Sequence, residues 1–430
     1  MSDEAKAFFC LSEELFDMIL HKLPIKSLIV CTSVCKTWNS IIKSPSFVSS
    51  HLSHTISSYK ENDTHLCLLR ICSIDAAEYR FSLRFDDQDL IECTSLQFPY
   101  RAKYWCHVFG SCNGLVLLMN GKFGTLPDRL FLWNPIVRKS LIISEKDLSA
   151  LFVAGLGFDS RANDYKVLTV SRIMHSDKAL KFELYSLNAN SWKQLDDVEA
   201  ISHGSVVVVS RKMAFLNGVL HFVALRRRSR GRPPMYLILG FDLQGEVFHE
   251  IMLPDGIVHN YRHPTVHVCG ESLAVVRFNR ANNGMDSILE IWVMKEYAVE
   301  GSWTKLSNIN ISLGGCARVL GFRKNGHVLL SMNKGSAWLL RNRVGQMVSC
   351  DPMSQEIKDL KIHGNHYWFF FDSFVESLIL LDKGNELSRY FEVESRYMTG
   401  TLNNATSSRN VMDFVHDDSS DEGSEDLGED

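Results

Sequence analysis

Hydrophobic positions follow one period in the first fifty residues and another in the rest of the chain. In the first part, apolar side chains recur every three or four positions, as they do on one face of a helix. Leu15 and Ile19 belong to the first such series, which Pro24 ends, and a third series is stopped by Pro45. We therefore predict a small domain of three helices at residues 9–50.

Three short helices leave part of their apolar surface uncovered, because a segment of roughly 40 residues buries too little of it. Two interpretations are open at this point. The Leu, Ile, Val and Trp side chains of the segment form a docking surface for a partner, or they pack on the rest of this chain.

From about residue 65 the pattern changes to short apolar runs separated by turns. The Asn-Gly pairs at 113–114, 217–218 and 325–326 each precede a strand-like run. Such pairs are typical of tight hairpins, because both turn residues must accept a positive φ. Related turns precede the runs at 165–168, 272–275 and 377–380, so a turn-then-strand unit recurs six times, about every 50 to 54 residues.

A second series of hairpins alternates with the first. Each member is a strand, a polar turn and a return strand that carries a bulky residue, at Trp192, Phe248, Trp303 and Ile357. Two hairpins per period make four strands, which is the arithmetic of a kelch-like β-propeller of about six blades. The alternative is a β-sandwich whose regular spacing is accidental. The predicted fold class is mainly β with a small α domain.

Composition and charge favour an intracellular globular protein. Hydrophobic residues make up 45% and charged residues 22%, and no apolar run is long enough to span a membrane. The N-terminus lacks the apolar stretch of a signal peptide, and the 11 scattered cysteines indicate reduced thiols. We expect a cytoplasmic protein, and the arginine run at 226–232 would also suit nuclear import.

The C-terminal segment differs from the rest in charge. Lys and Arg total 46 and Asp and Glu total 50, but nine of these acids lie between Asp413 and Asp430, so the remainder carries 46 − 41 = +5. Neither value indicates a nucleic-acid-binding protein. We predict that residues 401–430 form a disordered acidic tail. Within it, Ser419, Ser420 and Ser424 are candidate sites for an acid-directed kinase.

Candidate chemistry is sparse. His259, His263 and His267 are spaced by four, but Pro264 interrupts any helix that would align them, so we predict no metal site and no cofactor. Nucleophile and phosphate-loop motifs are missing from the sequence, which predicts a non-catalytic protein.

One strongly basic run lies between two predicted strands. It is interpreted either as a solvated loop or as a contact for an acidic partner surface. The candidate substrate-binding residues are Arg226, Arg227, Arg228, Arg230 and Arg232. Loops at one rim of a propeller are the expected recognition elements, and the candidates are residues 121–128, 172–181, 226–234 and 254–263.

The helical segment resembles an F-box. The runs Leu23-Pro24-Ile25-Lys26-Ser27-Leu28 and Val34-Cys35-Lys36-Thr37-Trp38 carry the resemblance, whereas Ser12 replaces a usual proline and 29–32 replaces an arginine-rich turn. The resemblance implies binding to a Skp-type adaptor and, through it, to a cullin. The implied adaptor-binding residues are Leu11, Leu15, Ile19, Pro24, Leu28, Val34, Cys35 and Trp38, some of which instead hold the helices together.

The β region resembles the plant F-box-associated domain, also found in S-locus F-box proteins. The most specific matching runs are 110–116, 132–135 and 288–297. The predicted division is an F-box at 9–50, a linker and start of the β body at 51–98, the propeller at 99–400 and the tail at 401–430. The resemblance implies a substrate-recognition subunit of a Skp–cullin–F-box E3 ubiquitin ligase. Its protein substrate is unknown, a pistil ribonuclease being one specific case.

Two alternatives to this function remain. One is a protein-interaction module that is not coupled to a cullin ligase. The other is a propeller enzyme, which would require converging carboxylates or a metal site at the propeller centre.

Overall fold

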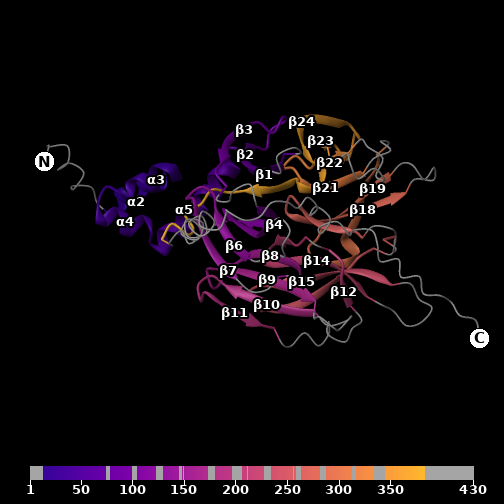
Figure 1. Cartoon of the computed structure of the whole chain (residues 1–430), viewed down its shortest axis with the longest axis horizontal. Coiled ribbons are helices and arrows are strands. Elements are labelled where there is room, and N and C mark those ends of the chain that lie inside the picture. The colour runs from indigo at the N-terminus through magenta and orange to yellow at the C-terminus, as the bar shows by residue number, and fades with distance from the viewer. Residues whose placement is uncertain are drawn as a thin grey trace, which may run out of the picture.

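Helices and sheets occupy separate parts of the molecule (Figure 1). The computed structural model describes residues 13–73, 78–98, 104–122, 129–144, 148, 150–172, 180–195, 206–210, 212–226, 234–254, 256–257, 263–280, 287–311, 316–333 and 344–382. Over these residues the fold is an N-terminal group of helices followed by a six-bladed β-propeller, which confirms the predicted fold class. The predicted tail at 401–430 lies outside the described residues.

The described helices are α2 (Glu13–His21), α3 (Ile25–Cys31), α4 (Lys36–Ile42) and α5 (Pro45–Glu61). Pro24 is the N-cap of α3, and the Cys35 side chain caps α4 by accepting a hydrogen bond from Trp38 N at 3.4 Å. Pro45 stands in the first turn of α5, where its missing N–H costs nothing. It therefore begins a long helix as well as stopping the preceding one, and this fourth helix was not predicted.

Six antiparallel sheets form the blades. From the innermost strand outward, blade 1 contains β25 (Phe370–Phe374), β1 (Leu66–Cys72), β2 (Tyr79–Phe85) and β3 (Glu92–Leu96). In the same order, blade 2 contains β4 (Tyr104–Cys112), β5 (Leu115–Lys122), β6 (Arg129–Asn134) and β7 (Lys139–Ser144). Blade 3 contains β8 (Leu151–Asp159), β9 (Asp164–Arg172), β10 (Leu180–Ser186) and β11 (Ser191–Gln194).

Blade 4 has a broken innermost strand, β12 (Val206–Val208) and β13 (Ala214–Leu216), followed by β14 (Val219–Arg226), β15 (Met235–Asp242) and β16 (Val247–Met252). Blade 5 contains β17 (Thr265–Cys269), β18 (Ser272–Arg280), β19 (Ser287–Met294) and β20 (Trp303–Ile311). Blade 6 contains β21 (Cys316–Phe322), β22 (Val328–Asn333), β23 (Val344–Cys350) and β24 (Ile357–Asn365). Short 3-10 turns, η1 (Glu300–Ser302) and η2 (His366–Trp368), precede β20 and β25.

The ring is closed by strands from opposite ends of the chain. β1 pairs with β25 from Leu66↔Phe374 to Arg70↔Phe370, so blade 1 takes three strands from before blade 2 and one from after blade 6. The predicted sixth strand at 377–380 is wrong, because β25 ends at Phe374 and residues 379–382 form a turn. The second strand of that blade comes instead from β1.

Most of the predicted turn chemistry is present. Asn113 and Gly114 both have positive φ, as do Asn217 and Gly218, which fits the predicted hairpins. In the third pair only Gly326 does, because that turn is a residue longer. The bulky positions of the second series all fall on the outermost strands β11, β16, β20 and β24.

Strand alternation gives the propeller two distinct faces. The turns between first and second strands, and between third and fourth strands, lie on one face, where α5 also leads into β1. We call this the helix face, and Figure 1 shows the helices beside it. The strand ends that flank second-to-third connections and inter-blade links open on the opposite side, the loop face. Among the described residues no helix is long and apolar enough to cross a bilayer.

Candidate functional site

The helical domain has an apolar core of its own. Leu20, Ile25, Leu28 and Ile42 are almost completely buried there, and Phe47 of α5 joins them. Leu28 is 0% exposed. Its match to the F-box pattern is thus explained by the packing of α2, α3 and α4 against one another.

A second set of apolar side chains on the same helices faces solvent. Leu15, Met18 and Ile19 follow one another at helical spacing along α2 and are all exposed. Val30 at the end of α3 is 68% exposed and Val34 before α4 is 62% exposed. Large apolar side chains gathered on so few helical turns are typical of a protein-binding surface. We call these five residues the helix surface.

The implied adaptor residues therefore separate into groups. Pro24 and Cys35 are exposed, like Leu15, Ile19 and Val34. Trp38 is half-buried and packs on Phe16, with ring centroids 5.1 Å apart. Leu11 lies outside the described residues. Met18 and Val30 were missed by the sequence analysis, although Met18 stands three residues after Leu15 and shares its helical face.

A joint connects the helices to the propeller. Tyr59 Oη of α5 donates a hydrogen bond to Glu376 Oε2 at 3.3 Å. Glu376 belongs to the segment after β25, which Asn134 holds on blade 2 through hydrogen bonds from Nδ2 to Ser377 O at 3.0 Å and Ile379 O at 2.9 Å. Ile379 and Leu52 of α5 share one buried cluster. The last described segment thus lies between α5 and the propeller.

Burial changes the acidity of both groups at this joint. It raises the pKa of the Glu376 carboxyl above its usual range, against the opposing hydrogen bond from Tyr59. Burial also raises the pKa of Tyr59, and the nearby Glu376 charge adds to the effect. The joint is therefore most stable with both groups protonated.

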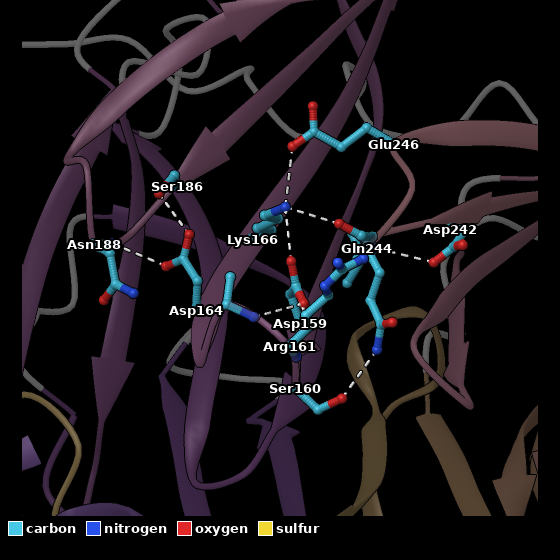
Figure 2. A network of polar contacts seen from close by, with 12 residues as sticks. Asp159, Ser160, Arg161, Asp164, Lys166, Ser186, Asn188, Asp242, Gln244 and Glu246 are labelled. Carbon is cyan, nitrogen blue, oxygen red and sulfur yellow. Dashed lines mark hydrogen bonds and ion pairs between the residues drawn. The ribbon is translucent and has the colours of Figure 1, made fainter. Parts of the chain in front are cut away.

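Blades 3 and 4 are held together on the helix face by a buried lysine (Figure 2). Lys166 Nζ of β9 contacts Asp159 Oδ2 at 2.9 Å within blade 3. It also reaches the β15–β16 turn of blade 4, where it donates to Leu243 O at 2.8 Å and Glu246 Oε1 at 3.0 Å. Although burial opposes both shifts, these contacts lower the pKa values of Asp159 and Glu246. The network fixes the relative position of the two blades.

The candidate substrate residues are only partly described. Arg226 ends β14 on the loop face, is half-buried and forms an ion pair with Glu250 of β16. Arg227, Arg228, Arg230 and Arg232 lie outside the described residues. Strand ends that flank the four candidate loops all open on the loop face.

The spaced histidines are engaged separately. His263 Nδ1 is 2.8 Å from Tyr236 Oη, whereas His267 Nε2 is 2.9 Å from Thr265 Oγ1. His259 lies outside the described residues. Within the described ranges, no group of three His, Cys, Asp or Glu side chains is arranged to hold a metal ion.

Comparison with known proteins adds independent information. The family model for the F-box domain matches residues 8–50, and the model described as F-box associated beta propeller domain matches residues 67–381. The chain is 28% identical to F-box protein At3g07870 of Arabidopsis thaliana over 84% of this chain and 89% of that protein. It is 26% identical to F-box protein CPR1 of the same plant, over 85% and 88%. F-box/kelch-repeat protein At3g23880, also from Arabidopsis thaliana, is 26% identical over 69% and 78%.

Proposed function

Because this chain belongs to the family of F-box proteins that carry an F-box associated beta propeller domain, we propose that it is the substrate-recognition subunit of a Skp–cullin–F-box E3 ubiquitin ligase. The helix surface carries this proposal. It presents five large apolar side chains to solvent on a domain whose own core is already complete.

The helix surface is the proposed contact for a Skp-type adaptor. Burying a side chain such as Leu15 or Val34 against a partner contributes about 1.5 to 3 kcal/mol. A few such contacts are enough to hold a stable complex once the cost of association is subtracted. The cullin is then recruited through the adaptor and needs no contact with this chain.

The loop face of the propeller is the proposed substrate side. It lies opposite the helix face, so that substrate and adaptor occupy separate surfaces of one body. The buried joint at Tyr59 and Glu376 supports a fixed relation between the two. A receptor of this kind acts by raising the local concentration of substrate near the ubiquitin-conjugating enzyme. Its own side chains need to perform no covalent step.

The substrate is proposed to be a protein met in the cytoplasm or the nucleus. A narrower version of the proposal is an S-locus receptor whose target is a pistil ribonuclease. That version rests on the shared architecture alone.

Affinity purification with quantitative mass spectrometry tests the adaptor assignment. We compare the full chain, the Val34→Asp variant and a chain lacking residues 1–50. The matched control is Met353→Asp, which places the same charge on an exposed apolar position of the propeller. We expect the adaptor and cullin to disappear from Val34→Asp and from the truncated chain but to remain with Met353→Asp. Proteins retained by all four samples are the candidate substrates.

Absence of a cullin from the full-chain sample would overturn the ligase assignment. The chain would then be a protein-interaction module that acts without a cullin ligase. Equal recovery of the adaptor with Val34→Asp and with the full chain would remove the helix surface from the interface.

A further inference from the structure

A lysine crosses the propeller axis because the innermost strand of blade 4 is broken. β12 and β13 both pair with β14, and the segment between them leaves the ladder. Ser210 Oγ fixes that segment by donating to Lys212 O at 2.8 Å and accepting from Lys212 N at 3.2 Å. Lys212 Nζ then donates to Leu320 O of blade 6 at 3.0 Å. Leu320 is the extra residue of a bulge in β21, which frees its carbonyl from the ladder.

Two arginines reach the same region. Arg318, two residues before Leu320, donates through Nη2 to Phe369 O. Arg70 of blade 1 donates from Nε to the preceding carbonyl, Trp368 O, at 3.0 Å. Adjacent acceptors on one chain segment therefore bring both guanidinium groups together, at the ends of β1 and β21 that are nearer the loop face.

Arg70 is buried without a carboxylate contact. It is 3% exposed, and its second hydrogen bond runs from Nη1 to Cys106 O at 2.7 Å. Its guanidinium carbon lies 5.5 Å and 5.7 Å from the ring centroids of Tyr79 and Trp368. Carbonyls and aromatic faces attract a cation, but they leave its full charge in place.

Among the described residues, Asp372 of β25 is the carboxylate that acts on Lys212. Its Oδ2 already accepts hydrogen bonds from Ser111 N and Ser111 Oγ, both at 2.9 Å. Burial raises the pKa of Asp372 and lowers that of Lys212, so both groups lie where water stabilises charge poorly. Three cations thus meet one described carboxylate in a desolvated place.

A further polar atom lies within electrostatic reach of Lys212. His267 is 3% exposed, and within the described part of the chain its Nδ1 has no hydrogen-bond partner. Lys212 Nζ uses one of its three N–H donors on Leu320 O. Donors and positive charge are therefore both present for an acceptor that the described side chains do not supply.

We propose that the loop-face half of the propeller axis binds a small oxyanion, a phosphate or carboxylate group, with Lys212 as its principal donor. A doubly charged phosphate would balance the excess of two positive charges. The site lies beneath the face proposed to hold substrate, but it does not depend on the ligase assignment. It differs from the basic run at 226–232, which contributes none of these groups.

The test is binding of inorganic phosphate to the purified full chain at constant ionic strength, followed by calorimetry and thermal unfolding. Acetate in a second titration distinguishes a carboxylate from a phosphate ligand. We expect phosphate or acetate to bind and raise the unfolding temperature. Lys212→Met should weaken binding by about tenfold or more, since a charge-assisted hydrogen bond is lost. The matched control Lys295→Met, an exposed lysine on a blade 5 turn, should bind as the unaltered chain does.

A second variant tests the charge argument with the opposite sign. Asp372→Asn keeps an acceptor for Ser111 but removes the competing negative charge, so it should tighten anion binding. This variant keeps the proposal testable where Lys212→Met fails to fold. No binding beyond that of chloride, equal binding by Lys212→Met, or weaker binding by Asp372→Asn would each overturn the proposal. Equal binding by Lys212→Met would place the ion elsewhere, with the basic run as the first candidate.

Discussion

Tyr59 and Glu376 are 317 positions apart in the sequence, yet they share a hydrogen bond of 3.3 Å between α5 and the segment that follows the last strand. This contact ties the helical domain to the propeller at the point where the ring has just been closed. Both groups have raised pKa values because they are buried.

The joint should make stability depend on pH. A raised Glu376 pKa means that the native state holds this proton more tightly than the unfolded chain does, so stability falls as the pH rises from about 4.3 through the raised pKa. Glu376→Gln should flatten that part of the profile, measured by urea unfolding between pH 4 and pH 8. Tyr59→Phe should cost about 1 kcal/mol at pH 5, where the carboxyl is more fully protonated. An unchanged profile in Glu376→Gln would remove this residue as its cause.

Two glycines at the same turn position give a matched pair. Gly114 and Gly218 have φ of +84° and +79°, so alanine at either site should cost roughly 1 to 2 kcal/mol through backbone strain. A Cβ at Gly114 would also lie 2.3 Å from Ser377 Oγ and 2.8 Å from Val375 O, whereas nothing lies within 4 Å at Gly218. We expect Gly114→Ala to be the more destabilising by a further 1 to 3 kcal/mol or so in urea unfolding. Equal losses would show that the segment after β25 yields freely.

The blade 3–blade 4 network offers a second matched pair. Lys166→Met leaves the buried Asp159 carboxylate without its cation and should cost about 3 kcal/mol. Lys193 pairs with the same Glu246 at 2.8 Å but is largely exposed, so Lys193→Met should cost less than about 1 kcal/mol. Chemical denaturation at pH 7 measures both, and similar losses would contradict the assignment of Lys166 as the main link.

The same network predicts acid sensitivity. The lowered pKa values of Asp159 and Glu246 mean that their contribution is present above their ordinary values near pH 4 and is lost as the pH falls through the lowered ones. Lys166 has a raised pKa, so its contribution is lost only at strongly alkaline pH. Unfolding of Lys166→Met should therefore respond less to acid than that of the unaltered chain.

Core and surface positions of the helical domain should respond differently to alanine. Leu28→Ala removes a fully buried side chain and should cost about 2 to 5 kcal/mol, whereas Val34→Ala should stay within about 0.5 kcal/mol. Hydrogen exchange of the α2, α3 and α4 amides reports this without a partner present. Rapid exchange in Val34→Ala would mean that the side chain supports the domain itself.

Several features of the fold follow from short stretches of sequence. The periods of three to four and of two, together with Asn113-Gly114 and Asn217-Gly218, predict helices, strands and hairpins because they act on neighbouring residues. The repeat spacing predicts the propeller for the same reason. The extra helix α5 was missed because Pro45 stops one helix and begins another.

The candidate site divides less well by sequence. The F-box pattern includes Leu28 and Val34 on equal terms, but one is in the core and the other is exposed. Only the packing angles of three short helices decide which apolar side chains meet each other. Val30 was missed for the same reason, since hydrophobicity alone does not reveal which side of a helix is covered.

The sequence by itself determined the kinds of element, their repeat and the family, because each depends on residues a few positions apart. The tertiary structure decided the closure of β1 on β25, the joint at Tyr59 and the meeting of Lys212, Arg318 and Arg70. These contacts join residues tens to hundreds of positions apart. Their geometry is fixed only when six blades complete a ring, and no local pattern records that condition.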